Sequence, residues 1–145
     1  MSGRFGGPVP DHLVPQVSPE AAELFAGAAR GELRIQRCRS CSKHQHYPRV
    51  LCSHCGAEGL EWVTASGRGT VHSFTVIRQH GVRPFSEWVP FVVALVDLEE
   101  EGARMLAVMP SVEPDEVTIG MPVVAEFRPA TDEVAFVDFR PAGRD

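Results

Sequence analysis

The sequence has no apolar run long enough to cross a membrane, for which about 18 consecutive apolar residues are needed. Residues 1–10 contain glycine and proline but lack the continuous apolar segment of a secretory signal peptide. We therefore expect neither a membrane span nor an export signal. Cysteine is scarce too, and all four cysteines lie between residues 38 and 55. Paired cysteines without an export signal indicate thiols kept in a reducing cytoplasm, so we predict a cytoplasmic location.

The sequence also lacks a recognisable catalytic motif. Ser66, Ser73 and Ser86 have none of the neighbours that accompany a catalytic nucleophile, and His72 and His80 stand isolated. An isolated histidine is more often structural or exposed to solvent. We therefore nominate no catalytic residue and expect no catalysis by this chain alone.

Charge is distributed unevenly along the 145 residues, whose formal net charge is −5. Residues 30–83 carry nine Lys or Arg against three Glu, a charge of +6, whereas residues 84–145 carry four Arg against thirteen acidic residues, a charge of −9. A basic region attracts phosphate groups, on nucleic acid or on a nucleotide-containing ligand. The alternative is that these arginines are solvated and keep a small domain soluble. The length fits one ordinary domain or two small ones.

The four cysteines form two C-x-x-C pairs, Cys38 with Cys41 and Cys52 with Cys55, separated by ten residues. Each pair can form a tight turn that directs two thiolates at one cation, and the gap is long enough for the second pair to face the first. Four thiolates are the ligand set of a closed structural zinc site, and the spacing lies within the zinc-ribbon pattern. A closed site has no position for water or substrate, so we predict that this metal holds the fold.

Other interpretations of the cysteines fit the sequence less well than zinc does. Two disulfides would need an oxidising compartment, and a redox motif would use a single C-x-x-C pair. An iron site of the rubredoxin type uses the same four-thiolate geometry, so iron stays open as an alternative metal. Three nearby histidines are interpreted as surface or supporting groups, because four cysteines already complete the site: His44, His46 and His54.

The N-terminal part of the chain is predicted to contain an arm, a helix and the ribbon. Residues 1–17 are rich in glycine and proline and are expected to form a flexible arm or linker. Ser18 suits the N-cap of a helix, and Gly31 suits its left-handed C-terminal cap. The apolar stripe of this short helix, which includes Leu24 and Phe25, must pack on the ribbon or on a partner. With ribbon strands over 33–37 and 60–65, the helix and ribbon form a unit over residues 18–66.

Residues 67–145 change to a pattern of short strands separated by turns. Strands are predicted over 70–77, 89–98, 103–109, 121–128 and 133–139. The three glutamates at 99–101 are predicted to form a solvated hairpin turn. Five antiparallel strands in about 70 residues indicate a small closed barrel, for which an OB-fold is the natural candidate. The predicted fold class is therefore mostly β: an N-terminal helix, a four-cysteine zinc ribbon, and a five-stranded OB-fold barrel.

This order of elements resembles one known family, in which a rubredoxin-like zinc ribbon precedes an acyl-CoA-associated OB-fold. The resemblance runs from about residue 22 to residue 139, and the cysteine frame and residues 66–71 are its most specific parts. One departure is Ser42, which stands where the first cysteine turn of the family has glycine. The resemblance is carried by Gly31-Glu32-Leu33, Gln36-Arg37-Cys38, Tyr47-Pro48-Arg49, Cys52 to Cys55, Trp62, Ser66 to Val71, Pro90-Phe91, Leu95-Val96 and Ile119-Gly120-Met121.

The resemblance implies an accessory role. Members of that family are similar to non-catalytic subunits of thiolase-fold enzymes that act on coenzyme A thioesters. Members similar to this chain partner thiolases of the lipid-transfer-protein type and support aldol cleavage, a C–C lyase step, of steroid side-chain CoA esters. Some relatives carry the same module behind a hydratase domain, and the arm over residues 1–17 would suit a linker from such a fusion.

The alternative function is binding of nucleic acid, because zinc ribbons and OB-folds both serve that purpose. An OB-fold that binds single strands needs stacking aromatics and a basic groove, whereas the barrel half of this chain is acidic. We therefore predict a protein partner and an acyl-CoA ligand, and expect no nucleic acid.

Two sets of residues are predicted to serve that accessory role. Guanidinium groups bind phosphate through paired hydrogen bonds, so basic side chains are candidates for contact with the coenzyme A phosphates. They are Arg68 and Arg78, followed by Lys43, Arg49 and Arg83. For Arg68, the alternative is that it caps the junction of ribbon and barrel. The partner interface is predicted at Phe85 and Trp88, in a loop longer than a hairpin needs, and at Leu24 and Phe25 of the helix. The alternative for Phe85 and Trp88 is that both rings fold back onto the barrel end.

Overall fold

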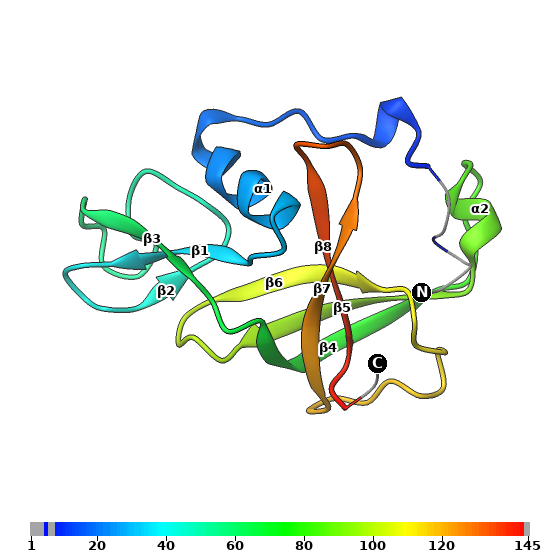
Figure 1. Ribbon diagram of the computed structural model, residues 1–145. Helices are drawn as coiled ribbons and strands as arrows, with labels where there is room; N and C mark the ends of the chain where they lie inside the picture. The colour runs from blue at the N-terminus through cyan, green and yellow to red at the C-terminus, as the bar shows by residue number, and fades with distance from the viewer. Residues whose placement is uncertain (1–4, 6–7, 144–145) are drawn as a thin grey trace.

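The structure, a computed structural model, describes residue 5 and residues 8–143 and consists of two β-sheets joined through a helix (Figure 1). The smaller sheet has the strand order β2-β1-β3, and the larger has the order β6-β5-β4-β7-β8. Figure 1 shows the smaller sheet beside one end of the larger, with α1 lying over the region where they meet. None of the described helices is long and apolar enough to cross a membrane.

The small sheet is the predicted ribbon. Strand β1 (Arg34–Cys38) pairs antiparallel with β2 (His44–Gln45) on one side and with β3 (Leu60–Thr64) on the other. The two-residue strand β2 was not anticipated, because two residues are too few to show a period in the sequence. The first cysteine turn closes with Ser42 at φ 68°, and the second with Gly56 at φ 79°. Ser42 thus adopts the left-handed conformation for which glycine is usual, as Gly56 does in the second turn. The amide of each residue donates to the carbonyl of the first cysteine of its turn at 2.9 Å.

The N-terminal helix begins later than predicted and packs differently. A 3-10 turn, η3 (Pro19–Ala21), leads into α1 (Ala22–Ala29), and the Ser18 side chain makes no capping hydrogen bond. Gly31 at φ 83° follows the helix in the left-handed conformation, as predicted. The apolar stripe packs on β8 and β7 of the large sheet as well as on β1 of the ribbon. The helix therefore joins ribbon and barrel, where packing on the ribbon or on a partner was expected.

The large sheet forms the five-stranded barrel. Its strands are β4 (Arg68–Ile77), β5 (Phe91–Leu98), β6 (Arg104–Met109), β7 (Pro122–Pro129) and β8 (Ala135–Pro141). All neighbours in the sheet pair antiparallel, and the two outer strands, β6 and β8, also approach each other. The first barrel strand, β4, lies at the centre of the sheet and is bulged between Val71 and Ser73. This strand order is that of an OB-fold, so the predicted fold is confirmed.

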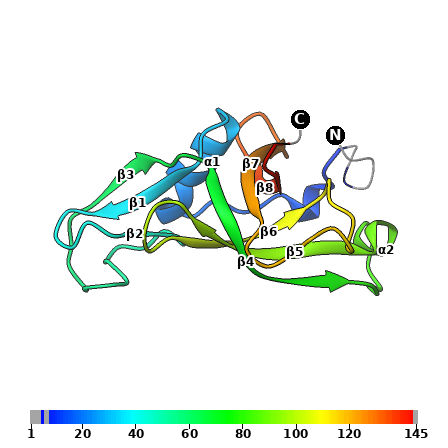
Figure 2. The same cartoon turned by 90° about the horizontal axis from the view of Figure 1, so that it is seen from below.

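One core serves the barrel and the helix together. Its centre is formed by alternating residues of the strands, with Phe139, Val92 and Val96 fully buried, and Leu24 and Leu33 extend it beneath α1. Seen from below, β5 and the later part of β4 lie on the face away from α1 (Figure 2). The arm contains a short 3-10 turn, η2 (Asp11–Leu13), and the β4–β5 connection contains a four-residue helix, α2 (Phe85–Trp88).

Candidate metal centre and neighbouring surfaces

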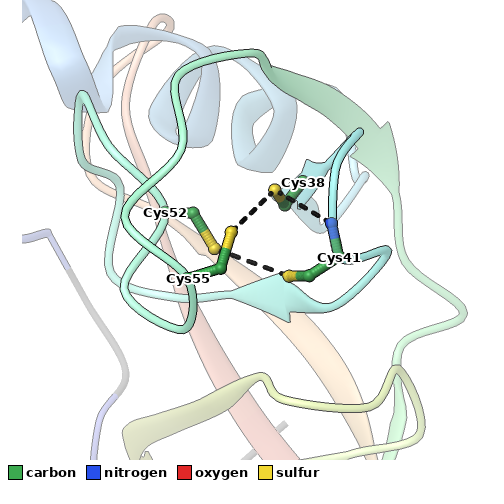
Figure 3. Close-up of side chains that lie close together, drawn as sticks. All are labelled: Cys38, Cys41, Cys52 and Cys55. Atoms are coloured by element: carbon green, nitrogen blue, oxygen red, sulfur yellow. Dashed lines mark hydrogen bonds between the residues drawn. The ribbon is translucent and has the colours of Figure 1, made fainter.

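The four cysteine side chains converge on one point between the two turns of the ribbon (Figure 3). All four Sγ atoms lie within 4.8 Å of one another, and the Cys38–Cys55 and Cys41–Cys52 pairs are each 3.7 Å apart. A zinc ion at about 2.3 Å from four sulfurs requires a sulfur–sulfur separation of about 3.8 Å. The donor set therefore fits a tetrahedral metal, and it draws one pair of ligands from each turn.

Backbone amides stabilise negative charge on the ligands. The amides of Ser40 and Cys41 donate to Cys38 Sγ at 3.3 and 3.5 Å. The Cys41 amide is the main cause that lowers the pKa of Cys38 to about 6, and the Ser40 amide adds to this effect. Burial acts in the opposite direction, raising the pKa. Burial alone would raise the pKa of Cys52, but the amides of Cys55 and His54 outweigh it and lower that pKa. The opposite holds for Cys55: the Ala57 amide lowers its pKa, but burial and the neighbouring thiols outweigh that amide and raise the pKa to about 11. Thiolates are the metal-binding form, so the turns favour that form at Cys38 and Cys52.

A buried pair of glutamines, which the sequence analysis did not predict, holds the loop that carries the second cysteine turn. The Gln36 and Gln45 side chains face each other across β1 and β2 and share a 2.7 Å hydrogen bond. The Gln36 amide also binds both the N–H and the carbonyl of Arg49 at 2.9 Å, and Gln45 Oε1 accepts from the Ser53 amide at 2.7 Å. The only sequence signal was polar residues at core positions of short strands.

The hairpin turn at 99–102 contacts the ribbon, while Glu99 and Glu101 are exposed to solvent as predicted. The His44 amide donates to the Glu101 carbonyl at 2.9 Å, and Glu100 accepts from the Ser66 amide at 2.8 Å. A Cβ atom on Gly102 would lie 2.6 Å from the His44 carbonyl oxygen and 2.8 Å from His54 Nε2. Only glycine therefore fits where the barrel hairpin meets the metal ribbon.

Most of the basic side chains between residues 30 and 83 are already paired. Six of the nine form ion pairs with described carboxylates: Arg30, Arg34, Arg37, Arg39, Arg68 and Arg83. The other three, Lys43, Arg49 and Arg78, are exposed and form no ion pair with a described residue. The charge of +6 therefore overstates the free positive charge on this part of the surface.

The five candidates for phosphate contact do not form one cluster. Arg68 makes a two-pronged ion pair with Glu99, at 2.8 and 2.9 Å, beside the ribbon–barrel junction. Arg78 directly follows the other end of β4. The rise per residue of a β-strand places it roughly 30 Å from Arg68. Lys43 and Arg49 belong to the ribbon, and Arg83 pairs with Glu87 at 3.4 Å. One ligand cannot reach all five, so contact with phosphate stays a prediction for individual residues.

The predicted interface aromatics pack on neighbouring side chains of the same chain. Phe85 and Trp88 are half-buried and contact each other edge-on at 5.3 Å, and Trp88 packs on Phe5 at 4.3 Å. Both rings are therefore covered in part by the chain itself. Leu24 is 9 % exposed and belongs to the core, whereas Phe25 is partly exposed. Whether a partner covers the remaining exposed parts stays a prediction.

The fold and the metal centre together define a protein with a zinc ribbon followed by an OB-fold. Residues 25–61 match the family described as the ChsH2 rubredoxin-like zinc ribbon domain, and residues 62–128 match the ChsH2 C-terminal OB-fold domain. The chain belongs to this family. The metal centre is accordingly the structural zinc site of the ribbon.

Solved and named relatives agree with that assignment. The structure superimposes on a chain of the "Ltp2-ChsH2(DUF35) aldolase" with a TM-score of 0.76 and 37 % identity, covering 88 % of this chain and 98 % of that one. The chain is 38 % identical over 128 residues to a "Probable enoyl-CoA hydratase alpha subunit" of Thermomonospora curvata, covering 88 % of this chain. It is 40 % identical over 126 residues, 82 % of this chain, to the "3-oxo-4,17-pregnadiene-20-carboxyl-CoA hydratase alpha subunit" of Mycobacterium tuberculosis. It spans only 39 % of the length of each of these two relatives.

Proposed function

We propose that the chain is a non-catalytic accessory subunit of a thiolase-like enzyme that carries out aldol cleavage of acyl-CoA substrates, in particular steroid side-chain CoA esters. The observation that carries the proposal is the superposition, over nearly all of the matched chain, on a chain of the "Ltp2-ChsH2(DUF35) aldolase". The metal centre supports a structural role, because four protein ligands leave no position for a substrate. The partner would therefore supply the reacting groups.

The loop between β4 and β5 is the proposed contact with that partner. It contains α2 and an exposed aliphatic residue, Val82, whose side chain is 58 % exposed. Exposed apolar side chains next to half-buried aromatics are typical of the centre of a protein interface. In the same loop, Arg78 is exposed and forms no ion pair with a described residue, and it is the proposed contact with a coenzyme A phosphate.

Reconstitution with a lipid-transfer-protein-type thiolase would test the subunit role. We expect co-purification of the two chains, and aldol cleavage of a steroid side-chain CoA ester only when both are present. Val82→Asp should weaken association at least tenfold, because it buries a charge at the contact. Ile119→Asp is the matched control, since that side chain is 70 % exposed and lies outside the loop. Equal association of the two variants would place the interface elsewhere, and cleavage by the partner alone would refute the subunit role.

Phosphate contact is tested separately on the assembled complex. Arg78→Ala should raise the Kd for acyl-CoA at low salt, and the difference should shrink at high salt as the charge is screened. Arg68→Ala should change it less, because Glu99 already binds that guanidinium. Unchanged affinity of Arg78→Ala at both salt concentrations would remove this residue from the ligand site.

A further inference from the structure

Exposed apolar side chains gather where the metal ribbon lies beside β6. Seven large apolar side chains are exposed among the described residues, and four of them lie in this region: Val50 at 72 %, Leu106 at 55 %, and Tyr47 and Leu51 at 48 % each. Three of the four belong to the loop between β2 and β3, and Leu106 belongs to β6. The Leu106 amide donates to the Tyr47 hydroxyl at 3.3 Å, which brings the two segments together. These four side chains are the ribbon patch.

The ribbon patch is continuous with further apolar surface. Tyr47 and Leu106 also line an apolar groove of about 640 Å³ beneath the N-terminal arm, whose residues Pro8 and Val9 line it too. Single exposed apolar side chains are ordinary on a protein surface, but a contiguous group marks an interaction surface. Figure 1 shows the ribbon at the end of the molecule opposite α2. The patch is therefore a different surface from the loop contact proposed above.

The loop that carries most of the patch is held in one shape from inside. The buried Gln36 side chain binds the N–H and the carbonyl of Arg49, each at 2.9 Å. The buried Gln45 side chain donates to the Leu51 carbonyl at 3.4 Å. The exposed side chain of Val50 lies between these two anchored residues. A surface that is already rigid loses little conformational entropy when it binds, so the loop is preorganised for a partner of fixed shape.

Two unpaired cations border the apolar centre. Lys43 and Arg49 are exposed and form no ion pair with a described residue, and Arg49 directly precedes Val50. An apolar centre with a charged rim is the usual anatomy of a protein interface, and carboxylates on the partner would complement these cations. A two-fold contact with a second copy of this chain would place the same patch on both sides. The cations of the two copies would then repel each other, which disfavours that occupant.

An anionic membrane would also attract cations beside apolar side chains, but it fits the patch less well. A fluid surface has no fixed shape, so it gains nothing from a loop held by buried amides. Exposed carboxylates lie close by, at Glu58 of the ribbon and at Glu101, whose carbonyl accepts from the His44 amide. An anionic surface would repel these carboxylates.

We propose that the ribbon patch docks into an apolar surface of the partner subunit that is bordered by carboxylates. Val50 and Leu51 enter the apolar centre, and Lys43 and Arg49 meet the carboxylates. This contact rests on the subunit role proposed above and adds a second contact at the opposite end of the chain. The buried apolar side chains slow dissociation, whereas the two cations speed association by steering the encounter.

Association of the full chain with a lipid-transfer-protein-type thiolase, followed by surface plasmon resonance, tests the contact. Val50→Asp and Leu106→Asp should each raise the dissociation rate constant about tenfold or more, because a charge enters the apolar centre. Ile119→Asp is the matched control, since Ile119 is 70 % exposed and lies outside the patch, and it should dissociate as the wild type does. Circular dichroism and zinc content check folding. If Val50→Asp loses zinc, Leu106→Asp decides, because β6 carries no metal ligand.

The two cations are tested through the association rate constant. Lys43→Gln and Arg49→Gln should each lower it about threefold at low salt, and the difference should vanish at high salt as the charges are screened. Arg140→Gln is the control with the same change of charge. Arg140 lies on β8 and pairs with Glu126 at 3.7 Å, so its loss should leave the rate constant unchanged. Equal rate constants for all three variants would overturn the role of the cations.

The outcomes separate this contact from the subunit role. No association of the wild type would overturn the subunit role and this contact together. Association of the wild type, with Val50→Asp and Leu106→Asp dissociating no faster than Ile119→Asp, would overturn this contact alone. Self-association in the ultracentrifuge that Val50→Asp abolishes would assign the patch to a second copy. Cosedimentation with phosphatidylglycerol vesicles that Val50→Asp abolishes would assign it to a membrane, and either result would overturn the proposal.

Discussion

At the scale of single residues, the buried glutamines show how a ribbon this small holds its second cysteine turn. Gln36 is 6 % exposed and Gln45 is 3 % exposed, and together they bind the backbone of the loop leading to Cys52. Buried amides are costly unless every group has a partner, and here the loop backbone provides those partners. The metal ligands are thus positioned by an amide network as well as by their own turns.

Gln36→Ala is expected to lower the stability of the ribbon, because it leaves Arg49 and Gln45 without their buried partners. The cost should be about 1–3 kcal/mol in the free energy of unfolding, measured by urea denaturation. Zinc release to a colorimetric chelator should also be faster. Gln79→Ala, at an exposed loop position, is the control and should change neither quantity. Equal behaviour of the two variants would show that the network does not stabilise the metal turn.

At the scale of elements, the β7–β8 pair contains a buried ion pair beneath the N-terminal arm. Arg128 and Asp138 lie on neighbouring strands, and their side chains are 15 % and 3 % exposed. The Arg128 guanidinium also lies over the Phe136 ring, 4.6 Å from its centre. Burial raises the pKa of Asp138 above its ordinary value, and the hydrogen bonds from Arg128 only partly oppose this. This carboxylate therefore depends on its arginine.

Arg128→Leu should cost about 3–5 kcal/mol in the free energy of unfolding, because it leaves Asp138 buried without its cation. The folded-state pKa of Asp138 is raised and should rise further in this variant. Its stability should therefore be greatest below the unfolded-state pKa and fall as the pH rises through the folded-state pKa. Urea denaturation at mildly acidic and at neutral pH measures this trend.

Arg140→Leu is the control for this prediction. Arg140 lies 3.7 Å from Glu126, and both side chains are about one-third exposed, so the expected cost is about 1 kcal/mol or less. A loss of stability in Arg128→Leu that is no larger than in the control, or that does not grow with pH, would contradict the assignment of a buried ion pair.

At the scale of the whole molecule, the ribbon and the barrel form a continuous structure through α1 and the 99–102 hairpin turn. The helix packs on strands of both sheets, and its buried residue Leu24 belongs to the common core. His44 of β2 and His54, which precedes the ligand Cys55, lie against the hairpin turn at Glu101 and Gly102. The state of the metal ribbon is therefore expected to affect the barrel at this turn.

Removal of the metal should loosen the ribbon, because metal binding supplies folding free energy in small metal domains. Freshly purified protein should contain one zinc per chain by elemental analysis. After chelation, hydrogen exchange should become faster in residues 34–64 and in the 99–102 turn, while β7 and β8 keep their protection. Zinc added back should restore the original pattern. The prediction fails if the fresh protein contains no stoichiometric zinc or iron, or if chelation leaves the ribbon protected.

The sequence by itself determined the features that depend on local pattern. Two C-x-x-C pairs predicted the four-thiolate centre, and alternating apolar residues with turns between them predicted all five barrel strands, because ligand spacing and strand period are properties of short segments. Tertiary structure decided what depends on residues brought together from distant segments. Examples are the packing of α1 on the barrel and the partners of Arg68 and Gln36. Two more are the contact of the 99–102 turn with the ribbon and the groove beneath the arm. No local pattern encodes them, because each exists only once the folded core sets which surfaces meet.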